Sequence, residues 1–268
     1  MSIELKYAMA RDTRLLILKM ANGVHKGHIG SALSVVELVQ AALDQVRGLG
    51  ETRMDRDRFV LSKGHAAMAL YASLNLRGVL TDLELNTYCQ NGSCIATHPM
   101  SSVRGIDFST GSLGQGITFA VGSALASKIR NTDGRVFCIL SDSEIDEGST
   151  WEAALFAAHH RLENLTVMLD LNGQQALGRT DEVLRISEVG SAWSSLGWDV
   201  TYVDGHNLEE ISGAIGRAQS VAKPHLIVGK TTAGKGVPFM ESKVEWHYFP
   251  MSEDQYQSAC ISVKDGIV

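Results

Sequence analysis

The sequence predicts an α/β fold, a doubly wound parallel sheet flanked by helices. Short apolar runs rich in Val, Ile and Leu show little polar alternation, which is typical of strands buried on both faces. From residue 110 onward these runs alternate with helical patterns, as a parallel sheet with helical crossovers requires. The N-terminal third is expected to be helical. Because no repeat, low-complexity tract or proline-rich linker divides the chain, residues 1–268 are expected to form a single domain.

Capping patterns mark where several helices begin. In a capping box a hydroxyl caps the helix, and an acid or amide three residues later caps back. The pattern, including one looser version that starts with Asn, occurs at four places: Ser34 with Glu37, Thr81 with Glu84, Asn207 with Glu210 and Ser252 with Gln255. Gly23 and Gly78 stand where helix ends are expected. The expected strands are RVFCIL (135–140), NLTVMLD (164–170), WDVTYV (198–203) and PHLIVG (224–229).

Composition excludes several classes of protein. The net charge is −6 and the isoelectric point about 5.8, so no basic face is expected for nucleic-acid binding. No run of eighteen apolar residues predicts a membrane span, and the N-terminus does not resemble a signal peptide. The four cysteines form no CxxC pair and no zinc spacing, and we interpret them as reduced thiols of a cytoplasmic protein: Cys89, Cys94, Cys138 and Cys260.

Two strand ends carry oxygen ligands. The run ILSDSEIDEG (139–148) places Asp142 directly after one strand, and Asn172 follows the next. The carboxyl ends of parallel strands meet at one edge, where ligands bind in such sheets. Carboxylate, amide and carbonyl oxygens suit Mg²⁺ or Ca²⁺ carried with a phosphate ligand. We interpret Glu144 and Asp146 as a solvated face that favours the following helix. Glu152 is open to two interpretations, a capping box with Ser149 or a catalytic role.

A glycine-rich turn and a set of histidines complete the candidate site. Gly111, Gly114 and Gly116 precede the helix ITFAVGSALASKI, and they indicate either close approach to an anion or flat ring, or tight helix packing. Four histidines stand beside Gly, Pro or an aromatic residue and suggest an imidazole-lined cleft: His28, His65, His98 and His247. The others lack this context and are interpreted as structural: His25, His159, His160, His206 and His225.

Taken together, these segments resemble the N-terminal, diphosphate-binding half of transketolases, which are thiamine diphosphate enzymes. The motifs follow the family's order over nearly the whole chain: GHIGSALSVVEL, DRFVLSKGHAAMALYA, THP, STGSLGQGI, SDSEIDEGSTWEAALFAAHH, NLTVMLDLNG, VDGH, GKGVPFME and EWH. The resemblance implies the thiamine diphosphate-binding fold. It also implies that Asp142, Asn172 and the carbonyl of Gln174 hold Mg²⁺ (or Ca²⁺) against the cofactor's diphosphate.

The resemblance assigns further roles. His65 and His247 would contact the diphosphate and face the reacting carbon, while His28 and His98 would line the substrate channel. Gly111 and Leu113 would lie against the cofactor's rings. Glu147 and Glu152 would be buried acids that link two active sites across a dimer interface. The chain departs from the family at Ser143, where a glycine usually lets the backbone approach the diphosphate.

The resemblance also implies a partner. A full transketolase has two further domains, so a separately encoded C-terminal subunit, the pyrimidine-binding half, is expected to complete an α2β2 assembly. WEAALFAAHH and ITFAVGSALASKI are candidate interface helices, or else ordinary core. The implied function is transfer of a two-carbon ketol unit from a ketose phosphate to an aldehyde. The alternatives are a sulfosugar, branched-sugar or specialised-metabolite acceptor, or a non-catalytic cofactor-binding or scaffolding subunit. The Asp-x-Asp pattern of a phosphatase nucleophile on a first strand is absent, which makes a metal-dependent phosphatase a poor alternative.

Overall fold

Five parallel strands form the central sheet, in the order β1-β2-β3-β7-β6. The computed structural model describes residues 2–24, 27–184 and 188–266. The strands of this sheet are β1 (Arg58–Leu61), β2 (Val136–Ser141), β3 (Leu165–Leu171), β6 (Asp199–Asp204) and β7 (His225–Lys230). Every neighbouring pair is parallel, which confirms the predicted fold class. A separate antiparallel ribbon pairs β4 (Gln174–Gln175) with β5 (Gly178–Arg179).

Strands β1, β2, β3 and β7 are buried on both faces, which explains why they lack polar alternation, whereas the edge strand β6 is partly exposed. In β2, Phe137 and Ile139 pack into one apolar core, whereas Val136, Cys138 and Leu140 pack into a second core on the other face. Strands β1, β3 and β7 also divide their side chains between these two cores. Alternate residues of a strand point to opposite faces, so each face needs its own helical cover.

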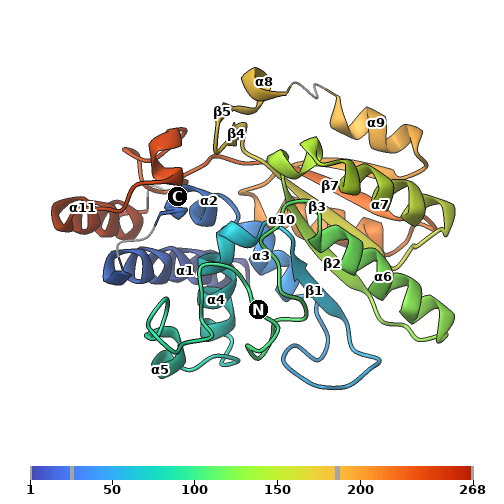
Figure 1. Ribbon diagram of the computed structural model, residues 1–268, viewed down its shortest axis with the longest axis horizontal. Coiled ribbons are helices and arrows are strands. Elements are labelled where there is room, and N and C mark those ends of the chain that lie inside the picture. The colour runs from blue at the N-terminus through green and yellow to red at the C-terminus, as the bar shows by residue number, and fades with distance from the viewer. Residues whose placement is uncertain (1, 25–26, 185–187, 267–268) are drawn as a thin grey trace.

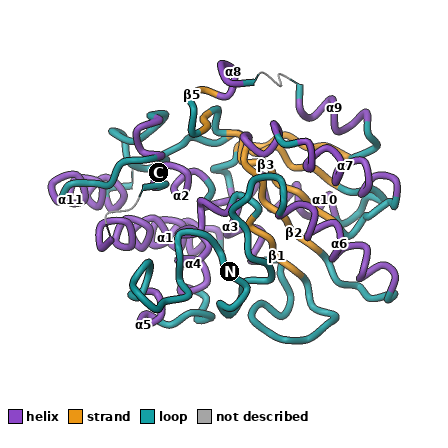
Figure 2. The backbone as a smooth tube through the Cα atoms, viewed as in Figure 1, coloured by secondary structure: helices purple, strands orange, loops and turns teal. Residues whose placement is uncertain are grey.

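Helices supply that cover on both sides (Figure 1). The second core is closed by α6 (Gly116–Ile129), α7 (Gly148–His159) and α9 (Val189–Ser195). The first core is closed by α1 (Ile3–Val24), α2 (Ile29–Ser34), α3 (Val36–Leu43), α4 (Ala67–Leu76), α10 (Leu208–Ala218) and α11 (Glu253–Lys264). The short helices are α5 (Asp82–Leu85), α8 (Thr180–Val183), η1 (Gly64–Ala66), η2 (Asp142–Asp146) and η3 (Val244–His247). Figure 2 shows the antiparallel β4–β5 ribbon at one end of the central sheet and the loop before β1 at the other end.

The N-terminal third is not purely helical, because it contains β1, an edge strand of the sheet. The prediction missed this strand because it has only four residues and follows a highly charged stretch. Pairing with β2, rather than a local signal, defines it.

Most of the predicted helix boundaries are confirmed. Thr81 and Ser252 form complete capping boxes, and Asn207 caps α10 through its side chain. Gly78 follows α4 with a φ of 70°, as expected just past a helix end. Two predictions are wrong. Gly23 lies inside α1, which ends at Val24.

Ser34 is the other exception, because it does not cap a helix. It is the last residue of α2, and α3 begins at Val36 without a side-chain cap. The Ser34 hydroxyl instead donates to the Asp170 carboxylate (2.8 Å), so a contact made far along the chain replaces the local one.

None of the helices in the described ranges is long and apolar enough to cross a membrane. No disulfide joins the four cysteines, all of which lie in the described ranges.

Candidate functional site

The structure brings the four predicted histidines together. The ring centroid of His28 lies 4.8 Å from that of His247 and 5.6 Å from that of His65. His98 stands 6.3 Å from His28, and His65 stands 5.4 Å from His247. These residues come from four segments far apart in sequence. The predicted imidazole cluster is therefore confirmed as a geometric feature.

Close backbone contacts hold this cluster together. His28 adopts a left-handed conformation (φ 64°) at the start of α2, and its N–H donates to the His247 carbonyl (3.0 Å). A Cβ at Gly64 would lie 2.8 Å from the backbone nitrogen of Gly111, so only glycine lets the β1–η1 turn approach that loop. This contact seats His65 beside the loop.

Burial keeps the imidazoles neutral. It lowers the pKa of His65 well below the usual value, and the neighbouring charges of Lys63 and the other histidines lower that pKa further. Burial is also the main reason that the pKa of His28 and His98 is lowered and that of His247 falls to about 4. A neutral imidazole has one nitrogen that donates a hydrogen bond and one that accepts a hydrogen bond. The buried Nδ1 atom of His28 has no hydrogen-bond partner among the described residues, which fits a ligand in the cluster.

Asp142 reaches from the end of β2 to the loop after β3. Its Oδ2 atom accepts hydrogen bonds from the Gly173 N–H and the Thr180 hydroxyl, both at 2.9 Å. Burial raises the pKa of this carboxyl to about 6, while Lys63 lowers it and Asp170 raises it by smaller amounts. A buried carboxylate with a raised pKa gains most from a cation placed beside it.

Asn172 lies in the same loop. Its Oδ1 atom accepts from the Gln174 N–H (2.9 Å), and its Nδ2 donates to Ser34 Oγ (3.1 Å). Asp142, Asn172 and Gln174 are thus brought together by one loop contact. No group of three or more His, Cys, Asp or Glu side chains in the described residues could hold a metal ion. A metal here would depend on one carboxylate with an amide and a carbonyl oxygen, a set that suits Mg²⁺.

A buried ion pair that the sequence did not predict lies between these two groups. The Lys63 ammonium, two residues after the end of β1, pairs with the Asp170 carboxylate near the end of β3, and both side chains are almost fully buried. Asp170 also accepts from Ser34 and from the Thr231 hydroxyl. Lys63 acts on the pKa of His65 as well as that of Asp142, so it lies between the imidazoles and the β3 loop. A charged residue within two positions of the end of β1 and of β3 was the available signal.

Glu144 is not solvated, which corrects the sequence-based interpretation. It is fully buried, and its carboxylate accepts from the Ser141 N–H (2.9 Å), the Gly114 N–H (3.0 Å) and the Ser62 hydroxyl. Ser141 and Glu144 form the capping box of η2. Burial raises the pKa of Glu144. Asp146 is half-buried and accepts from the Gln175 side chain (2.9 Å), so it is not a solvated acid either.

Tight packing explains the glycines at 114 and 116. Gly114 has a φ of 74°, and a Cβ there would lie 2.7 Å from the Glu147 Cβ. A Cβ at Gly116 would lie 2.6 Å from the Ser62 backbone. Gly111 lies against His98, and Leu113 is half-buried nearby in the chain. Close packing is therefore sufficient for Gly114 and Gly116, and Gly111 belongs to the imidazole cluster.

The remaining predicted site residues occupy the start of α7 and the turn before it. Glu147 is the N-cap residue of α7 and is half-buried. Glu152 is exposed, and Ser149 donates to the Gly114 carbonyl (2.9 Å), so the proposed capping box of Ser149 and Glu152 is wrong. Ser143 keeps a negative φ in η2 and exchanges a hydroxyl hydrogen bond with Ser141 (2.9 Å), so this position does not require glycine.

The other histidines lie apart from the cluster. His206 bonds to Glu37 (3.0 Å) and accepts from the Thr232 N–H (2.9 Å), while His225 bonds to Thr201 (3.0 Å). The remaining two stand at the end of α7: His159 and His160. His25 lies outside the described residues.

Comparison with known proteins identifies the family. Residues 5–262 match the family described as transketolase, thiamine diphosphate binding domain. A relative from Phocaeicola vulgatus, named as one subunit of apulose-4-phosphate transketolase, is 32% identical over 271 residues, covering 100% of this chain and 96% of the relative. A second relative, from Clostridium sp. (strain MSTE9), is named as a subunit of 6-deoxy-6-sulfo-D-fructose transketolase. It is 37% identical over 263 residues, covering 96% of each chain.

The solved structures agree with this assignment. Transketolase from Campylobacter jejuni superposes with a TM-score of 0.94 at 30% identity, over 98% of this chain but only 43% of that one. These similarities confirm the predicted fold and the predicted function as one component of a transketolase. The chain belongs to the transketolase family, whose thiamine diphosphate-binding domain it carries.

Proposed function

We propose that this chain is the cofactor-anchoring subunit of a two-component transketolase. The enzyme would move a two-carbon ketol unit from a ketose phosphate to an aldehyde acceptor. The observation that carries the proposal is one arrangement at the carboxyl edge of the sheet. Four neutral imidazoles gather at this edge, where the Asp142 carboxylate after β2 and the Asn172 amide in the loop after β3 can supply hard oxygen ligands.

In this proposal Mg²⁺ (or Ca²⁺) is held by Asp142, Asn172 and the Gln174 carbonyl. A diphosphate is too highly charged to be buried alone, and a divalent cation provides the largest local counter-charge. The raised pKa of Asp142 has the same origin, because a buried carboxylate lacks compensation until a cation is present. Ser143 would lie against the diphosphate, where its hydroxyl can donate.

The histidines divide the remaining work. Thiamine diphosphate, when bound, supplies a carbon nucleophile and an electron sink. His65 and His247 would contact the diphosphate side, while His28 and His98 would hydrogen-bond the donor sugar's hydroxyls and exchange protons with them. Gly111, which lies against the His98 ring, would form the wall for the cofactor's rings together with Leu113.

A separately encoded polypeptide would complete the enzyme. The similar proteins of nearly equal length are named as subunits, and this chain corresponds to 43% of a full-length transketolase. The partner would be the pyrimidine-binding half, supplying ring activation and most phosphate recognition. We favour an α2β2 assembly, because α6 and α7 leave large apolar side chains exposed: Phe119 by 42%, Leu155 by 53% and Phe156 by 44%. Burial of this surface would also cover Glu152, next to Glu147 at the start of α7.

The acceptor is a separate question. The two relatives are named for apulose 4-phosphate and for a sulfofructose, so a branched or sulfonated sugar is the second candidate for this enzyme. Much of the acceptor specificity would reside in the partner. A competition assay with the co-purified pair answers the question, by offering pentose phosphates together with a sulfonated or branched ketose.

The experiment that tests the function uses the same pair. The assembled complex, with thiamine diphosphate and Mg²⁺, should transfer a ketol unit to an aldehyde, whereas this chain alone should not. A complex that retains no cofactor and shows no calorimetric heat with it would instead favour a scaffolding role. We expect the enzyme to act in the cytoplasm, and residues 1–268 to fold as one domain.

A further inference from the structure

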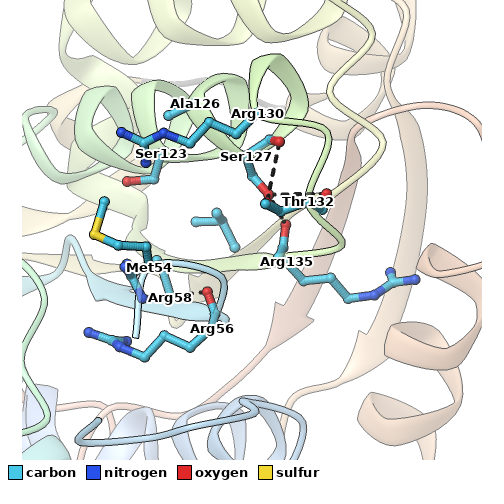
Figure 3. Close-up of a pocket in the computed structure, with 11 residues that line it drawn as sticks. Met54, Arg56, Arg58, Ser123, Ala126, Ser127, Arg130, Thr132 and Arg135 are labelled. Carbon is cyan, nitrogen blue, oxygen red and sulfur yellow. Dashed lines mark hydrogen bonds between the residues drawn. The ribbon is translucent and has the colours of Figure 1, made fainter. Parts of the chain in front are cut away.

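A second candidate site lies at the opposite end of the sheet from the imidazole cluster. A cavity of about 150 Å³ opens at the amino ends of β1 and β2, between the loop before β1 and α6 (Figure 3). Four of its lining residues are arginines, although the chain carries a net charge of −6. No part of the catalytic arrangement uses these residues.

The helix face above the cavity explains why the space exists. Ser123, Ala126, Ser127 and Arg130 recur at intervals of three and four residues, so they lie on one face of α6 and its C-terminal cap. Three of the four are small and leave room under the arginine. The Ser127 hydroxyl is engaged by Thr132 (2.7 Å), whereas no hydrogen bond joins the Ser123 hydroxyl to another described residue.

The guanidinium groups outnumber the carboxylates that face them. In Figure 3 the guanidinium groups of Arg56, Arg58 and Arg130 lie on the same side of the cavity, while that of Arg135 points away. Arg56 pairs with Asp107, and the Arg58 Nε atom is 3.7 Å from the same carboxylate. Arg130 forms no ion pair with any residue in the described part of the chain.

Neighbouring acids do not correct the imbalance. Asp57 and Asp133 are both held by Arg47, at 2.8 and 2.7 Å. Four guanidinium groups, those of Arg47, Arg56, Arg58 and Arg130, therefore stand against the three carboxylates of Asp57, Asp107 and Asp133, an excess of one positive charge. The partial negative charge at the end of α6, about half an elementary charge, offsets only part of this excess.

Two further observations show that the cluster is incomplete. The Nε atom of Arg56 is buried and has no hydrogen-bond partner among the described residues. Burial lowers the pKa of Arg58, and the nearby Arg56 and Arg130 lower it further, although Asp107 and Asp57 oppose them. An anion in the cavity would satisfy the donor and relieve the repulsion.

We propose that this cavity binds a small phosphate-bearing anion. Guanidinium groups present paired N–H donors that match the oxygens of a phosphate, and Ser123 can add a hydroxyl donor. The cavity of about 150 Å³ has room for a phosphate group. Either free phosphate or the phosphate end of a small monoester has this chemistry.

Calorimetry on the full chain tests the proposal with inorganic phosphate and with glycerol 3-phosphate, using glycerol as the uncharged reference. Binding should survive in the control Arg161→Gln, an exposed arginine after α7, and weaken at least about tenfold in Arg130→Gln. Phosphate binding should also be unchanged in His65→Gln, which distinguishes this site from the imidazole cluster. Equal affinity for the two phosphates would indicate free phosphate as the ligand, and tighter binding of glycerol 3-phosphate would indicate a monoester.

Three results would overturn the proposal. These are an absence of phosphate binding by the unmodified chain, unchanged affinity in Arg130→Gln, or loss of binding in His65→Gln alone. Crystals soaked in tungstate give an independent readout. An anomalous peak among Arg56, Arg58 and Arg130 is expected, and an empty cavity at a tungstate concentration that saturates the protein in solution would reject the site.

Discussion

The His98 side chain has few structural contacts within the imidazole cluster. It carries no ion pair among the described residues, and its Nδ1 atom meets only the neighbouring Thr97 hydroxyl (3.2 Å). Burial lowers its pKa, so the ring is neutral and able to exchange protons at pH 7. A catalytic role for His98 should therefore be separable from cofactor binding.

We predict that His98→Ala in the assembled enzyme leaves the affinity for thiamine diphosphate unchanged and lowers turnover by about 10²-fold or more, the usual size of a proton-transfer contribution. Steady-state kinetics and calorimetry measure the two quantities. His159→Ala, an exposed histidine at the end of α7, is the control and should have full activity. Full turnover in His98→Ala would remove this residue from the mechanism.

Ser143 allows a direct test of the departure from the family pattern. Its backbone has an ordinary negative φ, and its hydroxyl is held by Ser141. We therefore expect Ser143→Gly to change cofactor affinity by less than about fivefold, since a single exposed or weakly held hydrogen bond contributes about 1 kcal/mol or less. A gain of tenfold or more in calorimetry would show that the side chain crowds the diphosphate.

At the scale of the elements, η2 follows β2 and holds the glycine-rich turn before α6 through the side chain of Glu144. Glu144 accepts hydrogen bonds from Ser141 at the start of η2, from Gly114 before α6 and from Ser62 after β1. One buried carboxylate therefore fixes three segments of the carboxyl edge. Its position depends on these donors, because a buried acid without them would be costly.

Glu144→Gln should lower the free energy of unfolding by about 2–4 kcal/mol. The glutamine NH2 group would face hydrogen-bond donors of the protein that the carboxylate now accepts from, and at least one of these donors would be left without an acceptor. Urea denaturation measures the change. Glu163→Gln, a surface acid paired with Lys128, should cost less than about 0.5 kcal/mol. An equally small loss for Glu144→Gln would mean that the carboxylate does not organise this edge.

The elements also show what a sequence can and cannot predict here. The strands β2, β3 and β7 were predictable because burial on both faces produces unbroken apolar runs. The edge strand β6 is only partly buried, and its β-branched and aromatic residues made it predictable. Strand β1 was missed because four residues carry too little pattern, and pairing with β2 decides their structure.

The candidate site divides in the same way. The histidines and the Asp142–Asn172 pair were predictable because strand ends and glycine neighbours mark them in the sequence. Lys63, Asp170 and Glu144 were not, because their burial depends on partners 82 to 107 positions away. Ser34 has a capping pattern, yet Asp170 takes its hydroxyl. Long-range polar contacts override local signals at this edge.

At the scale of the whole molecule, buried histidines link stability to pH. Burial lowers the pKa of His247 to about 4, below the value of about 6.5 in the unfolded chain. The folded state therefore binds fewer protons than the unfolded state between these values. The contribution of His247 is fully present above pH 6.5 and is lost as the pH falls toward 4.

His247→Gln should therefore flatten the pH dependence of stability. The free energy of unfolding should fall between pH 7 and pH 4.5 by about 1–2 kcal/mol less in this variant than in the unmodified chain. This figure allows for solvent screening of a partly buried group. Urea titrations at both pH values give the difference. Buried acids such as Glu144, whose pKa is raised, affect the pH dependence of stability with the opposite sign. Because both proteins contain these acids, their contribution cancels in the comparison. Parallel pH profiles for the two proteins would contradict the assigned shift.

The most direct test of the whole account is calorimetry of thiamine diphosphate binding to the assembled two-component complex, with and without Mg²⁺. We predict tight binding only with Mg²⁺. Asp142→Ala and Asn172→Ala should each weaken it by about 100-fold or more, while gel filtration shows both complexes still assembled. If the cofactor binds Asp142→Ala as tightly as the unmodified complex, or binds equally well without a divalent ion, the cofactor is not anchored at the ends of β2 and β3.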